Sequence, residues 1–416
     1  MAGIMDYVVW RGDLSTAERP MNEVDYLILA ELSYAKMEGI VPGTDSDETV
    51  SINDICRKYV EQGTEQKELV NEPKDLVSVL PGTVRFGDMR AGWYVSWTDQ
   101  EQQTQFSAVT FFPGDGTVFV SFRGTDNTLT GWREDFNMSF LAETPGQLAA
   151  AKYMSFVCQK TELPVIAGGH SKGGNLAIYA GAFCGEDLRE RVRQIYSFDG
   201  PGFNRNIVAM PEYEAVLPKV QLIIPEQSII GILLSNKHKR KVIRSSAQGG
   251  MQHNPYTWLV TVGSFEEAGA QSPVSMFLDE TLNEWIEQLD DEQRAEFVDA
   301  VFDALEASGA VTFKEMNEQG WNGVKAVIRE ARSMEPERQK AVLDVVRRLA
   351  AVGTGAIWDE AKKSLVRVLE RGIPGAPRNQ AAGKEGETGK ITEEDTAQIE
   401  DRSSSQDADP DAGQNS

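Results

Sequence analysis

The sequence predicts an α/β fold with a mainly parallel sheet, and two observations support this class. Short runs rich in β-branched and aromatic residues alternate with segments of helical periodicity, as in sheets whose parallel strands are joined by helices. Residues 165–183, VIAGGHSKGGNLAIYAGAF, also join an apolar run to a small-residue helical pattern through a serine flanked by glycines. This stretch raises the question of whether Ser171 is a nucleophile held in a sharp turn or an incidental serine in a glycine-rich loop.

The elements are expected in the following order. An amphipathic helix is expected at 22–40, where apolar residues recur at helical spacing, namely Val24, Leu27, Ile28 and Leu32. Weaker helical patterning covers 53–80, and two strand-like runs within 105–125 meet at Pro-Gly-Asp-Gly, which predicts a hairpin. The remaining core elements are a helix at 145–160, a strand at 164–168, a helix from about Gly173, and strands at 193–199, 219–226 and 240–246.

Changes in texture divide the chain into four expected parts. Residues 1–91 form an N-terminal segment that packs on the core, and residues 92–274 form the α/β core. Residues 275–371 form a helical C-terminal region whose amphipathic helices are expected to be packing elements, with a surface for a protein partner as the alternative. Residues 372–416 form a disordered acidic tail, since they lack aromatic residues and are rich in Gly, Ser, Asp and Glu.

The bulk composition excludes several classes of protein. The chain has 416 residues, 41% of them hydrophobic, and a net charge of −23, which argues against nucleic acid or an anionic membrane as the main partner. Its three cysteines show no paired spacing, which favours a reducing compartment and no metal site. No secretory signal is recognised at the start, and no apolar run reaches the roughly 18 residues of a spanning helix. We therefore expect a cytoplasmic protein without a transmembrane segment or cofactor.

Ser171 is the candidate nucleophile. Gly169 to Gly173 fit Gly-x-Ser-x-Gly, and the pattern has the required context of a strand before it and a helix after it. The glycines suit a tight turn in which larger side chains would collide with the strand or the helix. The helix N-terminus beneath the serine also favours a developing negative charge. A phosphate-binding loop is disfavoured because no Gly-Lys-Ser/Thr sequence occurs here.

A serine nucleophile needs a base, and the chain has three histidines. His253 is favoured, because it lies in a loop after the last strand-like run and follows the serine in chain order. His238 is the alternative, although it lies in the basic run SNKHKRK, which we expect on a solvated face. His170 precedes the serine, so its side chain is expected to point away from it and to pack or hydrogen bond elsewhere.

The acid has two candidates. Asp199 ends the strand after the nucleophile helix, where a carboxylate could hold the imidazole in the correct tautomer. Its structural alternative is to cap the Gly-Pro-Gly turn. The next strand offers Glu226, which would otherwise be a solvated loop acid.

An oxyanion hole needs two backbone N–H groups near the nucleophile. One is expected from Lys172, the residue after the serine. The other is expected from the loop after an earlier strand, where VFVSFRGTD makes Thr125 the candidate.

Several stretches together resemble a known family. FVSFRGTDNTLTGWREDF, GGHSKGGNLAIYA, FDGPGFN and QHNPYTW, with the opening DYVVWRGDLS, resemble the Mbeg-like family of bacterial α/β-hydrolase-like proteins over residues 5–258. Those proteins are similar to the class 3 (fungal-type) lipases, and the resemblance implies an α/β-hydrolase core with Ser171 as nucleophile and Thr125 in the oxyanion hole. It departs at the acid: class 3 lipases carry theirs one strand later, where this chain has Ser228 in PEQSIIG.

These residues lead to three functional hypotheses. The first is a serine hydrolase that cleaves the acyl ester of a small-molecule or lipid-like substrate. The second is a thioesterase, peptidase or acyltransferase, because all of these share the same constellation and the fold does not fix the substrate. The third is a catalytically inactive interaction protein, to which the helical C-terminal region and the acidic tail point.

Overall fold

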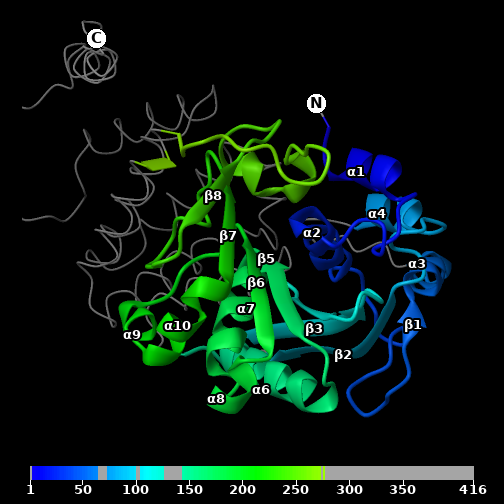
Figure 1. The fold of residues 1–416 in the computed structure, drawn as a ribbon, viewed down its shortest axis with the longest axis horizontal. Coiled ribbons are helices and arrows are strands. Elements are labelled where there is room, and N and C mark those ends of the chain that lie inside the picture. The colour runs from blue at the N-terminus through cyan, green and yellow to red at the C-terminus, as the bar shows by residue number, and fades with distance from the viewer. Residues whose placement is uncertain (1, 64–72, 100–103, 126–142, 273–274, 277–416) are drawn as a thin grey trace, which may run out of the picture. The chain divides into compact units, whose positions relative to one another are not determined.

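Neighbouring strands in the chain are also neighbours in the sheet. The computed structural model describes residues 2–63, 73–99, 104–125, 143–272 and 275–276. Within them, one eight-stranded sheet runs in the order β1 to β8 (Figure 1). The strands are β1 (Val50–Ser51), β2 (Arg90–Asp99), β3 (Thr104–Phe112), β4 (Val118–Phe122), β5 (Val165–His170), β6 (Val192–Phe198), β7 (Val220–Pro225) and β8 (Arg240–Ile243).

The sheet is mixed and mostly parallel, which confirms the α/β class. Strands β1 to β4 pair antiparallel, and β4 to β8 pair parallel. The hairpin expected from Pro-Gly-Asp-Gly joins β3 to β4, and both of its glycines, Gly114 and Gly116, adopt positive φ. The expected strands at 164–168, 193–199, 219–226 and 240–246 correspond to β5, β6, β7 and β8.

Helices cover both faces of the sheet. They are α1 (Ile4–Arg11), α2 (Glu23–Leu32), α3 (Ile52–Glu61), α4 (Lys74–Val79), α6 (Pro145–Lys160), α7 (Lys172–Phe183), α8 (Glu186–Arg189), α9 (Arg205–Val208) and α10 (Pro211–Val216). From β4 to β8, each parallel strand lies next to the one before it, always on the same side. Because connections between parallel strands are right-handed, the connecting helices α6, α7 and α10 lie on one face of the sheet, where they share a core. Residues of α1 to α4 share a second core with the opposite face (Figure 1).

Helix α2 is buried on every side, so the expectation of an amphipathic helix was wrong. Val24, Leu27, Ile28 and Leu32 are buried as expected, but so are the helix's three acids. The helix is enclosed because it lies between the sheet and the surrounding N-terminal segment. Asp25 is accommodated by Arg85, whose Nη2 lies 2.6 Å from Oδ2 with both side chains fully buried. Burying an ionised carboxylate without such a partner would lower the stability of the fold. Glu31, the third acid of α2, has no cationic partner of this kind among the described residues.

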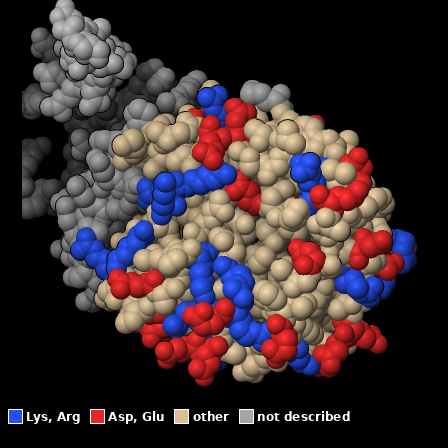
Figure 2. Space-filling view, viewed as in Figure 1, with Lys and Arg blue, Asp and Glu red and all other residues tan. Residues whose placement is uncertain are grey.

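Other expectations concern the ends and the surface of the chain. From residue 277 onward, the expected helical region and acidic tail lie outside the described residues. The division into four parts therefore stays a proposal. Among the described residues, no helix combines the length and apolar character needed to cross a bilayer. On the face seen in Figure 2, Lys and Arg side chains lie among Asp and Glu and do not gather into one basic patch.

Candidate active site

Ser171 lies at the turn between β5 and α7 in a strained backbone conformation. Its φ is 56° and its ψ is −131°, a region that residues with a side chain rarely adopt. The flanking glycines allow the turn: a Cβ on either Gly169 or Gly173 would collide with the carbonyl oxygen of Phe122 at the end of β4. The Ser171 N–H donates to Phe198 O at 2.9 Å, which anchors the turn to β6. The sequence pattern thus forms a sharp strand-to-helix turn that holds the serine at the end of the parallel strands.

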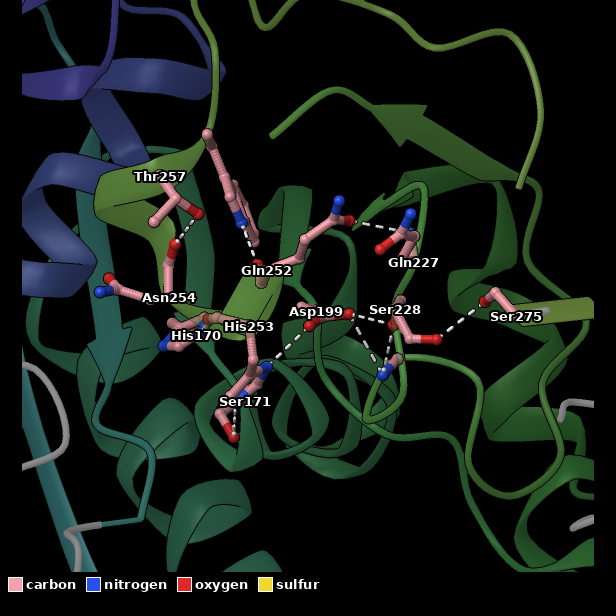
Figure 3. Close-up of polar contacts among 12 residues, drawn as sticks. His170, Ser171, Asp199, Gln227, Ser228, Gln252, His253, Asn254, Thr257 and Ser275 are labelled. Atoms are coloured by element: carbon pink, nitrogen blue, oxygen red, sulfur yellow. Dashed lines mark hydrogen bonds and ion pairs between the residues drawn. The ribbon is translucent and has the colours of Figure 1, made fainter. Parts of the chain in front are cut away.

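The imidazole of His253 connects Ser171 to Asp199. His253 ends a short 3-10 helix, η2 (Gly249–His253), in the loop after β8. Its Nε2 lies 3.0 Å from Ser171 Oγ, and its Nδ1 lies 2.7 Å from Asp199 Oδ2 (Figure 3). The His253 side chain is 15% exposed, whereas the Asp199 side chain is fully buried. Three residues from distant parts of the chain therefore meet in hydrogen-bonding order.

Asp199 follows β6 directly and is held by two donors besides His253. Its Oδ1 accepts a hydrogen bond from Ser228 Oγ at 2.5 Å and from the Gly231 N–H at 3.2 Å (Figure 3). A Cβ on Gly231 would collide with that oxygen, so the close approach requires glycine. Ser228, which the sequence resemblance singled out as a departure, therefore contacts the carboxylate that follows the preceding strand. The sequence indicated this position as a departure but did not predict the contact.

Two glutamines hold the segment that carries His253. The Gln252 side chain accepts from the Gln227 N–H at 2.8 Å and donates to Ala247 O at 3.0 Å. Gln227 Oε1 in turn accepts from the Gly249 N–H at 2.5 Å, and the Trp258 indole donates to Gln252 O at 2.7 Å. These bonds connect the loop after β7 to the loop after β8 (Figure 3). Sequence reasoning missed them, and the one available signal was that Gln252 adjoins the candidate base.

His170 packs beneath His253 and points away from Ser171 Oγ, as expected. It is 2% exposed, and its Nε2 lies 3.0 Å from the main-chain oxygen of His253. The two rings are 4.6 Å apart between centroids at 34°. On its other side, His170 Nδ1 lies 3.3 Å from Glu31 Oε1 and 3.5 Å from Tyr34 Oη. Burial lowers the pKa of His170 well below its ordinary value.

The alternative base and acid lie in other surroundings. His238 was expected on a solvated face, but it is 9% exposed and packs against the ring of Tyr213, so that expectation was wrong. Burial lowers its pKa to about 4, and neither ring nitrogen has a hydrogen-bond partner among the described residues. For Glu226, the hydrogen bonds found are those of its backbone, to Ile243 O and from the Ser272 N–H.

Of the two candidate oxyanion residues, one follows the serine in the chain and the other belongs to the loop after β4. Lys172 begins α7, and its buried side chain donates to Gln105 O at 2.9 Å. Thr125 is buried and follows Gly124, where a Cβ would lie 3.3 Å from Ser171 Cβ and 2.5 Å from His170 O. The loop after β4 thus runs directly against the serine. Whether the two amides bind an oxyanion stays a prediction.

Among the described residues, no group of His, Cys, Asp and Glu side chains is arranged to hold a metal ion. The groups that are hydrogen bonded at the candidate site are the Ser171 hydroxyl, the His253 imidazole and the Asp199 carboxylate. This arrangement can move a proton from the hydroxyl to the imidazole while the carboxylate stabilises the resulting charge.

The fold and site define an α/β protein with serine, histidine and aspartate at the carboxyl ends of the parallel strands. The chain belongs to the Mbeg1-like family, whose model matches residues 80–303. Among solved structures, it is similar to the Rhizomucor miehei lipase propeptide complex, with 14% identity and a TM-score of 0.32. That match covers 52% of this chain and 66%, just under two thirds, of that chain. No curated protein matches the chain.

Proposed function

We propose that this protein is a serine hydrolase that cleaves acyl esters, with Ser171 as nucleophile, His253 as base and Asp199 as acid. The observation that carries the proposal is the pair of hydrogen-bond distances at His253: 3.0 Å to Ser171 Oγ and 2.7 Å to Asp199 Oδ2. Both are within the reach required for general-base catalysis. The chain order of serine, aspartate and histidine is that of α/β hydrolases.

The proposed reaction proceeds in two halves. Ser171 Oγ attacks the acyl carbonyl while His253 Nε2 takes the hydroxyl proton, and the tetrahedral intermediate collapses to an acyl-serine as His253 returns the proton to the leaving alcohol. Water then attacks the acyl-serine while His253 Nε2 takes a proton from it. The second tetrahedral intermediate collapses, the carboxylic acid product leaves, and His253 returns the proton to Ser171 Oγ. Asp199 holds the proton on Nδ1 of His253 throughout, so that Nε2 can accept a proton at the start of each half, and its carboxylate stabilises the charged ring that forms.

The negative charge on the tetrahedral intermediate needs donors that are already in position. We assign this role to the backbone N–H groups of Lys172 and Thr125. Helix α7 begins at Lys172, so its N-terminal dipole also favours the anion. Each such donor typically contributes about 3 kcal/mol to transition-state stabilisation.

The direct test is covalent labelling with a fluorophosphonate probe, followed by mass spectrometry to locate the adduct. We expect one adduct, at Ser171, with no adduct in Ser171→Ala. Ser197→Ala is a matched control, because Ser197 is a fully buried serine whose hydroxyl has no hydrogen-bond partner among the described residues. Folded wild-type protein that remains unlabelled, and that hydrolyses no ester above the rate of Ser171→Ala, contradicts the proposal.

A substrate panel separates ester hydrolysis from the related reactions. The panel contains p-nitrophenyl esters of increasing acyl length, acyl thioesters and aminoacyl amides, and we expect the esters to be cleaved fastest. Preferential cleavage of thioesters or amides would retain the nucleophile assignment and reassign the substrate class. Binding of a partner protein that survives Ser171→Ala, without turnover of any panel member, would instead support a non-catalytic role.

A cytoplasmic location belongs to the same proposal. Cys56, Cys158 and Cys184 are all free and buried, as suits a reducing compartment. Fractionation of cells that express the protein tests this assignment.

A further inference from the structure

A second acid lies behind the proposed triad, on the far side of His170. Glu31, in α2, is about 1% exposed, and neither of its carboxyl oxygens accepts a hydrogen bond from any described residue. An isolated carboxyl in such a place is destabilising, so its retention calls for a physical reason. The one ring nitrogen at close range is His170 Nδ1, 3.3 Å from Glu31 Oε1.

The contact of His170 with His253 determines where the His170 proton resides. His170 Nε2 lies 3.0 Å from the His253 carbonyl oxygen, which can only accept. Nε2 must therefore carry the proton. In the neutral ring, Nδ1 is then an acceptor, and it needs a donor on the Glu31 side. Two groups lie there: the Glu31 carboxyl at 3.3 Å and the Tyr34 hydroxyl at 3.5 Å.

The electrostatics favour a neutral pair of groups. Burial raises the pKa of Glu31 to about 8, and burial together with nearby His253 lowers the pKa of His170 well below its ordinary value. The ionisable groups that face this cluster are His253 on η2, Tyr34 after α2, and Tyr256 on η3 (Pro255–Thr257), with the charge of Asp75 on α4 acting on Tyr256. Around neutral pH, Glu31 therefore carries a proton that it can donate.

We propose that Glu31 is a positioning residue for the reaction. Its protonated carboxyl donates a hydrogen bond to His170 Nδ1, which keeps the His170 proton on Nε2. The Nε2–H group then donates to the main-chain carbonyl of His253 and fixes its position. This inference rests on the proposed function for its catalytic consequence. The resulting arrangement is a second acid–imidazole pair, stacked beneath the first. It acts on the backbone of the catalytic histidine, whereas Asp199 acts on the ring.

The replacement Glu31→Met removes the donor and retains the side-chain volume. It also removes a desolvated carboxyl, so we expect thermal stability near neutral pH to rise or stay equal. We expect kcat to fall by about tenfold with KM unchanged, the effect of losing one positioning hydrogen bond. A purely structural role predicts one of two other results. Either stability and activity both fall, or activity does not change.

Glu31→Gln is the conservative rescue. Its amide can donate to His170 Nδ1 at every pH, so we expect activity within about twofold of wild type at pH 7. In wild type, kcat should decline as Glu31 loses its proton above about pH 8, and in Glu31→Gln this decline should be absent. Ser121→Ala is the matched control, because it removes a fully buried hydroxyl that has no hydrogen-bond partner among the described residues and is not among the groups that face this cluster.

The ¹⁵N shifts of His170 test the proposal independently of turnover, and the chain's three histidines make assignment practical. We expect the Nε2–H tautomer in wild type and Tyr34→Phe, and a mixture of tautomers in Glu31→Met. A proton on His170 Nδ1 in wild type, an unchanged tautomer in Glu31→Met, or loss of the Nε2–H form in Tyr34→Phe but not in Glu31→Met overturns it. An absence of ester turnover in wild type would refute the proposed function, while the tautomer measurement would still decide the role of Glu31.

Discussion

The Ser228 hydroxyl donates a hydrogen bond to Asp199 Oδ1, with 2.5 Å between the two oxygens. Oδ2 of the same carboxylate therefore remains for His253 Nδ1, which lies 2.7 Å away. The Gly231 N–H donates to Oδ1 as well. The loop after β7 therefore supplies two donors to a carboxylate that follows β6. Ser228, the departure noted in the sequence, thus holds the carboxylate of the proposed triad.

Replacing Ser228 with alanine should weaken catalysis and leave the fold intact. Loss of one charge-assisted hydrogen bond of about 1.5–3 kcal/mol frees Asp199 to rotate, and we expect kcat to fall by about tenfold or more. Steady-state ester hydrolysis measures the effect. Ser121→Ala, which removes a fully buried hydroxyl from β4 that has no hydrogen-bond partner among the described residues, is the control and should change kcat by less than about twofold. Equal loss in both variants would argue against an orienting role for Ser228.

The identity of the acid is tested by a pair of isosteric replacements. Asp199→Asn retains the shape but favours the wrong imidazole tautomer, and we expect kcat to drop by about 10⁴-fold, the size of effect found in other Ser-His-Asp sites. Glu226→Gln should change kcat by less than about twofold. Both are measured by ester hydrolysis, with the circular dichroism of each variant checked against wild type. A larger loss in Glu226→Gln than in Asp199→Asn would reverse the assignment.

Burial of His238 predicts that the protein loses stability in acid. Its pKa is lowered from 6.5 to about 4 in the folded state, so the unfolded chain binds the proton more tightly between these values. Stability is therefore retained above about pH 6.5 and lost as the pH falls towards 4. This one group should account for about 2 kcal/mol of unfolding free energy between pH 7 and pH 5, since one pKa unit corresponds to about 1.4 kcal/mol.

Urea unfolding of wild type and His238→Phe at pH 7 and pH 5 measures this contribution. The buried His170 acts in the same direction in both proteins, because its pKa is also lowered. The difference between the two proteins therefore isolates His238. Identical pH dependence in the two proteins would show that His238 is not buried in neutral form. Ester hydrolysis near pH 7 should be retained in the variant, since His253 and not His238 contacts Ser171.

The nucleophile turn should not tolerate a methyl group at Gly173. A Cβ there would collide with Phe122 O, and backbone cannot move aside as a flexible side chain can. We expect Gly173→Ala to lower the unfolding free energy by about 3 kcal/mol and to reduce fluorophosphonate labelling of Ser171 strongly. Gly263→Ala, where the nearest heavy atom would lie 3.4 Å from the new Cβ, is the control. It should change stability by less than about 0.5 kcal/mol. A similar small effect at Gly173 would mean that the turn is looser than described.

Much of the candidate site could be predicted because its signals are local. The glycines around Ser171 identify the turn within five residues, and the scarcity of histidines leaves few candidates for the base. The position of Asp199 directly after a short apolar run places it at the end of a strand. In contrast, nothing within a few residues of Glu31 distinguishes it from an exposed helix acid, and the basic neighbours of His238 suggested exposure. Burial depends on what covers a segment, and that cover comes from distant parts of the chain.

The sequence by itself determined the α/β class and the order and type of the strands and helices expected from residue 105 to 246, and it favoured Ser171, His253 and Asp199 over the alternatives His238 and Glu226. These features follow from side-chain periodicity and turn chemistry, which act over a few residues. Only the tertiary structure decided that Ser228 holds Asp199, that α2 is enclosed on all sides, and that Glu31 lies against His170. Such pairs depend on strand order and on which segment covers each face of the sheet, and these are settled by burial of the whole chain and not by any local pattern.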